Sequence, residues 1–183
     1  MGKTNKLILP WKISSIIKNS VETCIQSDTH EVIVVLGHQS AEIRNELNPL
    51  EVCFVENPSF ESGMLSSIQA AIPKVSSKSA GWMVFLGDQP KIPQNLVNHL
   101  IEHFQKHYEA EKDLIVLPVC AGIRRNPVIF SRSFNKRMMA HQGEGGKAMI
   151  DAHQDSLLEV EVEDVTLFED IDTEEDYDLL KPN

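Results

Sequence analysis

The stretch Phe85-Leu86-Gly87-Asp88-Gln89-Pro90 ends an apolar run that begins at Trp82. A pattern typical of an amphipathic helix follows it, from 93 to 108. This order predicts a buried strand whose last residues present a carboxylate to a loop. Because ligands bind at the carboxyl ends of strands in open α/β sheets, we expect Asp88 to hold a metal ion next to a phosphate.

The rest of the chain alternates in the same way between apolar runs and helical patterns. The run from 31 to 36 is rich in β-branched residues and stops at Gly37, which is typical of a strand. Further strands are expected at 52–55, 114–119, 127–130 and 157–162, with helices at 13–26, 40–47, 63–72, 133–140, 146–153 and from 174 onward. This alternation predicts an α/β fold with a Rossmann-like, mostly parallel sheet that has helices on both faces.

Size and composition limit the class of protein. A chain of 183 residues is long enough for one well-filled core, so we expect a single domain over 1–183. The formal net charge of −10 argues against nucleic acid as a partner, because nucleic-acid binding needs a basic face. No apolar run approaches the roughly 20 residues of a membrane helix, so no membrane partner is expected. Three widely spaced cysteines are typical of a reducing compartment, which predicts a cytoplasmic protein.

The start of the chain differs from what such a fold predicts. A strand and a glycine-rich turn normally open it, whereas here a short segment leads from Gly2 and Lys3 to the first predicted helix. We therefore expect the domain to be incomplete at its N-terminus. Gly2, Lys3 and Lys6 occupy the place of a phosphate-binding turn, although a solvated basic terminus explains the same residues.

A second acidic cluster lies near the C-terminus, at 169–172. Asp172 is the candidate partner of Asp88, since hard oxygen ligands and a phosphate are the usual surroundings of Mg²⁺ in proteins. Each aspartate also has a plainer interpretation, because Asp88 can start a turn and Asp172 can belong to the acidic first turn of a helix. Their joint presence at strand ends of one α/β domain favours the metal site.

Two loops can contribute further contacts. The loop from Asn57 to Ser67 follows a predicted strand and enters a helix, so its glycine and serine residues, Gly63 among them, can offer amides and hydroxyls to a nucleotide. A serine of this loop can instead cap the helix. Arg124 and Asn126 precede another strand, and their interpretation stays open between loop structure and recognition of an anion.

Several motifs carry a family resemblance: Met-Gly-Lys-x-x-Lys-Leu at 1–7, Asn-Pro-x-Phe-x-x-Gly-Met at 57–64, Gly-Asp-Gln-Pro at 87–90, Asn-Pro-Val at 126–128 and Asp-Ile-Asp-Thr at 170–173. In order and spacing they resemble those of the molybdenum cofactor cytidylyltransferases, within the MobA-like nucleotidyltransferases. The resemblance implies the fold of the nucleotide-diphospho-sugar transferases. It also implies a Mg²⁺-dependent transfer of CMP from CTP to the molybdopterin cofactor, with release of pyrophosphate.

The resemblance also implies a role for each candidate residue. Asp88 and Lys6 would be catalytic, with Asp88 as a metal ligand and Lys6 at the triphosphate. Asp172 would be the second metal ligand, with Asp170 as its substitute. The residues expected to border the nucleotide are Gly2, Lys3, Lys6, Asn57, Gly63 and Ser67, and those expected on the pterin side are Arg124 and Asn126.

The implied partners are CTP or another NTP, the molybdopterin cofactor, and a molybdoenzyme or its chaperone that receives the product. The chain departs from the family pattern because it lacks the opening strand and the segment Leu-Ala-Ala-Gly-x-Ser-x-Arg, and Arg125 stands where a glycine is more usual. Two alternatives therefore stay open: a catalytically impaired nucleotide- or cofactor-binding module, and a nucleotidyltransferase for another phosphorylated acceptor.

Overall fold

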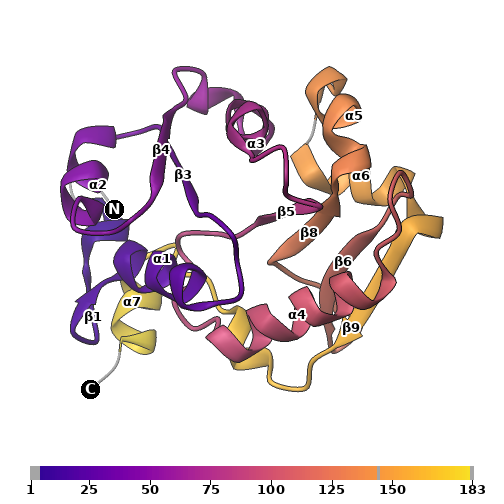
Figure 1. Cartoon of the computed structure of the whole chain (residues 1–183). Helices are drawn as coiled ribbons and strands as arrows, with labels where there is room; N and C mark the ends of the chain where they lie inside the picture. Colours follow the sequence, from indigo (N-terminus) through magenta and orange to yellow (C-terminus); the bar gives the residue numbers. More distant parts are fainter. Residues whose placement is uncertain (1–4, 144, 182–183) are drawn as a thin grey trace.

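The computed structural model describes residues 5–143 and 145–181 (Figure 1). Its α-helices are α1 (Ile16–Gln26), α2 (Ser40–Leu47), α3 (Met64–Ala71), α4 (Gln94–His107), α5 (Asn135–Ala140), α6 (Gly145–Ala152) and α7 (Glu174–Leu180). Its strands are β1 (Pro10–Trp11), β2 (Ser14–Ser15), β3 (Ile33–Leu36), β4 (Cys53–Glu56), β5 (Gly81–Val84), β6 (Ile115–Cys120), β7 (Ile123–Arg124), β8 (Val128–Ser131) and β9 (Leu157–Glu161). Several 3-10 turns join them, among them η1 (Lys6–Ile8).

The strands from β3 onward form a five-stranded sheet and a separate parallel pair. In the larger sheet the hydrogen-bonded order is β5-β8-β6, and β6 also pairs with β7 and β9. β9 is parallel to β6, whereas β8 is antiparallel to both β5 and β6. β3 pairs with β4 in parallel, with Ile33 opposite Cys53. The expected α/β class is confirmed, and the larger sheet is mixed because β8 returns between two strands that run the other way.

Helices cover both faces of the larger sheet, as its continuous apolar strands predict. Along β6, Ile115, Leu117 and Val119 point to one face and pack against α3, α5 and α6. Val116 and Cys120 point to the other face and pack against α4. All residues of β6 are buried, so this strand is the centre of the core.

The carboxyl ends of the strands gather along one edge. β5, β6 and β9 run in the same direction, because β8 is antiparallel to β5 and β6 and β9 is parallel to β6. Glu31, just before β3, accepts hydrogen bonds from Ser76 N at 2.6 Å and Ser79 Oγ at 3.4 Å, and both serines lie just before β5. The side chain of Glu31 therefore links the starts of β3 and β5, which belong to separate sheets. We infer that the loops that follow β3, β4, β5, β6 and β9 lie near one another.

Segments near the two ends of the described chain contact each other, and α7 lies beside β1 in Figure 1. The hydroxyl of Tyr177 in α7 donates to the carbonyl oxygen of Pro10 at 2.8 Å. Ile171 has no exposed surface and packs with Trp11 and Ile16. The segment after β9 is therefore part of the core around the start of α1.

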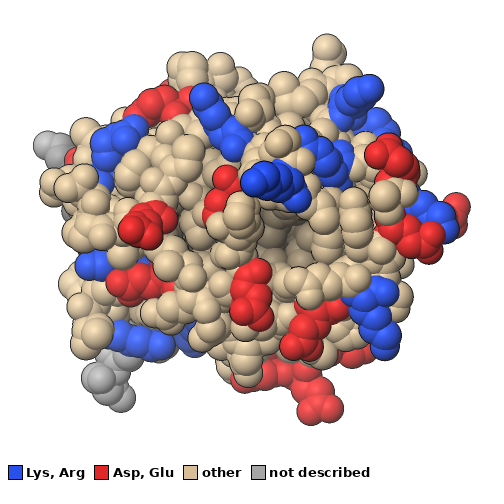
Figure 2. Space-filling view, in the orientation of Figure 1, with Lys and Arg blue, Asp and Glu red and all other residues tan. Residues whose placement is uncertain are grey.

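The surface carries charges of both signs. Figure 2 shows acidic and basic side chains interspersed over one face of the molecule, without a continuous basic patch on that face. Among residues 5–143 and 145–181, no helix has both the length and the apolar character that a bilayer crossing requires.

Replacing Ile171 by alanine is expected to destabilise the fold. The change removes a fully buried side chain between Trp11 and Ile16, and such truncations lower the free energy of unfolding by about 2–5 kcal/mol. Leu179→Ala is the matched control, because Leu179 is 82% exposed and its loss should change stability by less than about 0.5 kcal/mol. Urea unfolding of the two variants checks the difference. Equal stabilities would mean that the C-terminal segment is not docked as described.

Candidate active site

Lys6 lies between two carboxylates that are far apart in the sequence. Its Nζ donates to Asp88 Oδ2 at 3.0 Å and to Asp172 Oδ1 at 2.8 Å. The side chains of Lys6 and Asp88 are about a quarter exposed, whereas that of Asp172 is 69% exposed. The structure thus brings together the three residues on which the sequence-based metal and triphosphate hypothesis rests.

The loop that carries Asp88 is fixed against α1. Ser20 Oγ donates to the carbonyl oxygen of Gly87 at 3.2 Å, and Asn19 Nδ2 donates to that of Pro90 at 2.8 Å. A Cβ on Gly87 would come within 2.6 Å of Ile17 Cδ1, so any larger residue at this position would have to displace the end of the Ile17 side chain. The Gly-Asp-Gln-Pro motif therefore holds the carboxylate of Asp88 at the end of β5.

The segment from 169 to 172 docks on the same loop along its whole length. Ile171 N donates to the carbonyl oxygen of Asp88 at 3.3 Å. Gln89 Nε2 donates to Asp170 Oδ1 at 2.7 Å, and Lys91 Nζ lies 2.6 Å from Glu169 Oε2. Because side chains at 169 and 170 are held by residues 91 and 89, the carboxylate of Asp172 is directed to Lys6.

A capping box immediately after Asp172 orients its backbone. The Thr173 side chain accepts a hydrogen bond from Asp176 N, and the Asp176 side chain accepts one from Thr173 N, as in other capping boxes. Asp176 Oδ2 also accepts from Asp172 N at 3.2 Å. Asp172 thus lies just before α7 and its carboxylate binds Lys6, whereas Asp176 in the first turn of the helix forms the capping box.

The backbone of Lys6 is held by its neighbours. Asn5 caps η1 by accepting a hydrogen bond from Leu7 N at 3.1 Å. Leu7 and Leu9 pack against the cluster of Trp11, Ile16 and Ile171 and so anchor the segment that carries Lys6. The ammonium group of Lys6 is therefore positioned in the site by a segment that packs on the core.

The cluster changes the pKa of two of its members. Burial by itself would lower the pKa of Lys6, but hydrogen bonds to Asp172 and Asp88 outweigh burial, and the pKa is raised above its ordinary value. Burial raises the pKa of Asp170, and the charges of Asp88 and Asp172 add to this effect, while Gln89 and Lys6 oppose it. The site is therefore a place where negative charge exceeds positive charge.

This donor set suits a hard divalent cation shared with a phosphate. Magnesium commonly binds through one or two carboxylates together with substrate phosphates and water. Among the described residues no group of three or more His, Cys, Asp or Glu side chains forms a complete metal cage. Asp88 and Asp172 already lie around the cationic group of Lys6. This pair therefore fits a magnesium site that is completed by substrate phosphates and water.

The loop after β4 forms a separate hydrogen-bonded cluster. Asn57 is 4% exposed, and its Nδ2 donates to Ser66 Oγ at 2.9 Å and Ser67 Oγ at 3.0 Å. Its Oδ1 accepts from Ser59 N at 2.9 Å. Gly63 is the N-cap of α3, with a φ of 95° that favours glycine, so the expectation of a serine cap is wrong. The first amides of α3 have no side-chain cap.

Arg124 and Asn126 follow β6 at the same edge of the sheet. Arg124 Nε donates to Glu159 Oε1 at 2.6 Å, and Arg124 Nη2 donates to Gln154 Oε1 at 2.6 Å. The guanidinium is thus engaged with β9 and the turn before it, which supports the structural interpretation of this residue in the present conformation. Asn126 is half-buried. Gly2 and Lys3 lie outside the described residues.

Gln89 and Lys91 are the members of the site that sequence reasoning missed. Both lie in the loop after β5, and both bind the acidic segment from 169 to 172. Charge could have identified Lys91, which is a cation three residues after Asp88 in an acidic protein, whereas the neutral Gln89 gives no such signal. Their partners lie about 80 residues away along the chain, so no local pattern identifies the pairing.

Comparison with known proteins shows the family of the chain and supports its fold. Residues 1–158 match the model of the MobA-like NTP transferase domain. The molybdenum cofactor cytidylyltransferase of Escherichia coli K12 is 27% identical over 178 residues, which are 94% of this chain and 84% of that protein. The crystal structure of Rv0371c from Mycobacterium tuberculosis H37Rv has a TM-score of 0.83 at 20% identity and covers 97% of this chain and 89% of its own. Its complex with manganese has a TM-score of 0.79 at 21% identity, covering 98% and 92%.

Fold and site together define a nucleotidyltransferase-like α/β domain with carboxylates at the carboxyl edge of its sheet. The family match covers most of the chain. The chain therefore belongs to the MobA-like NTP transferase family.

The carboxyl group of Asp170 is expected to titrate above its ordinary pKa of 3.8, and further above it when Lys6 is replaced by methionine. The ammonium of Lys6 lowers the pKa of Asp170, so its removal must raise that pKa. NMR titration of the side-chain carboxyl measures both values, with Lys147→Met as a control that leaves the cluster unchanged.

The raised pKa of Asp170 also predicts how the stability of the protein depends on pH. A carboxyl with a raised pKa in the folded state binds its proton more tightly there, so stability falls as pH rises through the window between the two pKa values. Asp170→Asn should therefore be more stable than the unaltered protein at neutral pH and lose this advantage in acid. An unchanged or lowered pKa in Lys6→Met would contradict the described contacts.

Proposed function

We propose that the protein transfers CMP from CTP to the molybdopterin cofactor and releases pyrophosphate. The observation that carries the proposal is the meeting of Asp88 and Asp172 around Lys6, in a chain of the MobA-like NTP transferase family. The similarity to a molybdenum cofactor cytidylyltransferase over nearly the whole chain supports CTP and molybdopterin as the substrates.

The reaction is an in-line displacement at phosphorus. A terminal phosphate oxygen of the molybdopterin attacks the α-phosphorus of CTP and forms a new P–O bond, while the bond to the β-phosphate breaks and its electrons leave with pyrophosphate. No protein nucleophile is needed. The protein has to align the two phosphates and to offset the charge of their oxygens.

Asp88 and Asp172 would hold a Mg²⁺ ion at the phosphates. When bound, such an ion supplies positive charge to the oxygens of the reacting and leaving phosphates. Manganese in a structural neighbour supports a divalent cation for this fold. Lys6, which the two carboxylates share in this structure, would face the triphosphate and offset further negative charge.

The nucleotide would extend toward the loop after β4. Asn57 and Ser67 hold this loop in shape, and Gly63 leaves the first amides of α3 without a side-chain cap. Free amides at a helix start suit a phosphate or a polar group of the nucleotide. Gly2 and Lys3 would contact the phosphates, and Arg124 and Asn126 would face the pterin, which requires Arg124 to exchange its contact with Glu159.

A catalytically impaired binding module of the same fold is the second candidate. One observation favours it: Lys6 forms ion pairs with both carboxylates, so a metal ion at this place would have to displace its ammonium group. Transfer to another phosphorylated acceptor is a variant of the first proposal, since nothing at the carboxylates selects the acceptor.

Asp88→Asn and Asp172→Asn are each expected to lower the rate of pyrophosphate release from CTP and molybdopterin by about a hundredfold or more. The reason is that much of the rate enhancement in such reactions comes from stabilising the charge on the reacting phosphates. Asp155→Asn is the control, because this exposed aspartate lies just before β9, at the opposite edge of the sheet. Release measured with each NTP in turn identifies the base. Equal rates in Asp88→Asn and the unaltered protein would refute the catalytic proposal.

Lys6→Met is expected to separate metal binding from transfer. Without the ammonium, the two carboxylates no longer have an internal cation to displace, so calorimetry should find Mn²⁺ bound at least as tightly as in the unaltered protein. Transfer should fall, since the charge at the triphosphate is lost. Asp88→Asn should lose Mn²⁺ affinity. If both variants bind Mn²⁺ equally poorly, Lys6 is needed to build the site and does not compete with the ion.

A further inference from the structure

Helix α4 carries three histidines at intervals of four residues. His99, His103 and His107 therefore follow one another along one side of the helix, because residues four positions apart are neighbours on its surface. The first two are the ends of the segment His-Leu-Ile-Glu-His at 99–103. Two histidines at this spacing on a helix can bind one zinc ion. The spacing makes the pair a candidate metal site, and the structure has to distinguish such a site from a plain hydrated helix face.

These histidines lie beside the buried stripe of α4. The buried residues of the helix, which pack against β6, β8 and β9, are Leu96, Val97, Leu100 and Phe104. His99 is exposed and His103 is half-buried. An ion from solvent can therefore reach the two imidazoles, while the helix that carries them is fixed by its packing on the sheet.

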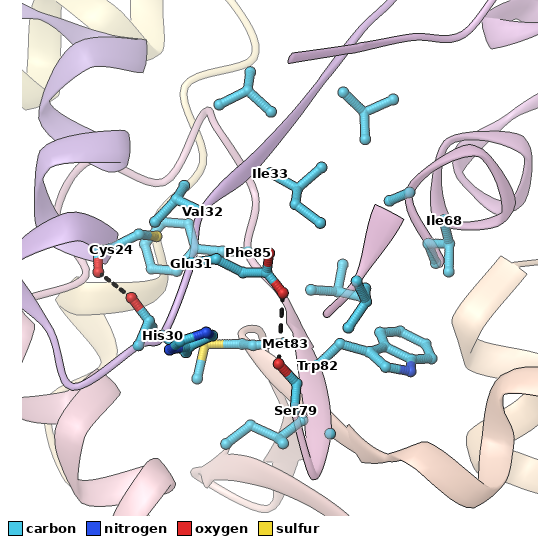
Figure 3. Close-up of a pocket in the computed structure, with 18 of the residues that line it drawn as sticks. Cys24, His30, Glu31, Val32, Ile33, Ile68, Ser79, Trp82, Met83 and Phe85 are labelled. Atoms are coloured by element: carbon cyan, nitrogen blue, oxygen red, sulfur yellow. Dashed lines mark hydrogen bonds between the residues drawn. The ribbon is translucent and has the colours of Figure 1, made fainter. Parts of the chain in front are cut away.

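The cavity next to α4 lies on another side of the helix. It has a volume of about 720 Å³, and α4 contributes Ile101 and Gln105 to its walls, among others. Residues two positions apart point to nearly opposite sides of a helix, so His99 and His103 point away from these two residues. Figure 3 shows the side chains that line the cavity, with His30 as the one labelled histidine. The histidine pair of α4 is therefore a feature of the outer surface, separate from the cavity.

The rings of His99 and His103 lie close together. Their centroids are 4.7 Å apart, and the rings meet edge to face. Nδ1 of His103 is buried and has no hydrogen-bond partner among the described residues. Nδ1 of His107, by contrast, is 2.8 Å from the carbonyl oxygen of His103, and the centroids of these two rings are 6.1 Å apart. The pair of His99 and His103 is therefore the better candidate, because its rings are closer and one of them keeps an unused nitrogen.

The electrostatic surroundings favour a cation at this place. α4 ends at His107, so the negative end of its dipole lies about one turn beyond His103. Glu102 adds a carboxylate next to His103, although Lys106 on the following turn opposes it. The net charge of the chain is −10, which makes its long-range potential attractive for cations. Both the helix end and the protein as a whole therefore attract a divalent ion.

We propose that His99 and His103 form a binding site for a transition-metal ion of the class of Zn²⁺, Ni²⁺ and Cu²⁺, with water in the remaining positions. Imidazole ligands suit these ions, whereas carboxylates suit Mg²⁺ and Mn²⁺. Because χ2 of histidine is a soft torsion, both rings can turn a nitrogen toward one ion without moving the helix. The site therefore selects a different class of ion from the pair Asp88 and Asp172.

The proposed site has two protein ligands. Among residues 5–143 and 145–181, no group of three or more His, Cys, Asp or Glu side chains is arranged to hold a metal ion. Hydrolytic zinc centres use three protein ligands together with a water molecule. The histidine pair is therefore a binding site for an ion and not a second catalytic centre.

Calorimetry with Zn²⁺ alone, on the full chain, tests the proposal. His99→Gln and His103→Gln should each weaken the affinity for Zn²⁺ by about tenfold or more, because one of two protein ligands is lost and even the loss of an outer-shell partner commonly costs that much. Glutamine is chosen since it keeps a polar side chain of good helix propensity. His107→Gln is the matched control on the same helix and should leave the affinity nearly unchanged.

NMR of the histidine side chains gives a second measurement, on the unaltered protein. Zn²⁺ should shift the imidazole signals of His99 and His103, while Mg²⁺ at the same concentration should leave them in place. The proposal is overturned if His99→Gln or His103→Gln leaves Zn²⁺ binding unchanged, because these histidines are then part of a hydrated helix face only. It is also overturned if His107→Gln loses as much affinity as His99→Gln, or if Mg²⁺ shifts the same signals. Neither measurement depends on transfer activity, so the proposed function is tested separately.

Discussion

The docking of Ile171 against Trp11 and Ile16 is the constraint on which the site depends. The fully buried side chain of Ile171 fixes the position of its neighbours, and its main-chain amide binds the carbonyl oxygen of Asp88. An aspartate on either side of this isoleucine is thereby brought to the loop after β5. Lys6 then neutralises charges that would otherwise repel one another in an acidic protein. Apolar packing positions the carboxylates, and the positive charge of Lys6 reduces the electrostatic repulsion between them.

The elements of the fold are largely predictable from the sequence because their signals are local. The helix expected at 93–108 is α4, and the strand expected at 114–119 is β6, each within one residue at either end. The order of the strands in the sheet was harder to predict from the sequence. β8 lies antiparallel between β5 and β6, which is a consequence of long-range packing. β1, β2 and β7, each of two residues, are too short to leave a periodic pattern.

The site is only partly predictable, for a related physical reason. Asp88 can be proposed because it ends an apolar run, and Asp172 because it lies in an acidic cluster near the C-terminus. Their meeting at Lys6 agrees with that hypothesis. The contact of Gln89 with Asp170 depends on how two distant loops pack, which no local signal contains. Arg124 shows the opposite case, since its expected role in recognition competes with an ion pair to Glu159 that only the fold reveals.

The hydrogen bond between Tyr177 and Pro10 has a consequence for folding during synthesis on the ribosome. The larger sheet is complete once β9 has emerged, but Asp172 and the helix that orients it come afterwards. A nascent chain can therefore hold its central sheet while one of the two carboxylates of the candidate site is still absent. Because domains generally fold as units during synthesis, the meeting of Asp88 with Asp172 at Lys6 becomes a marker of synthesis that has passed α7.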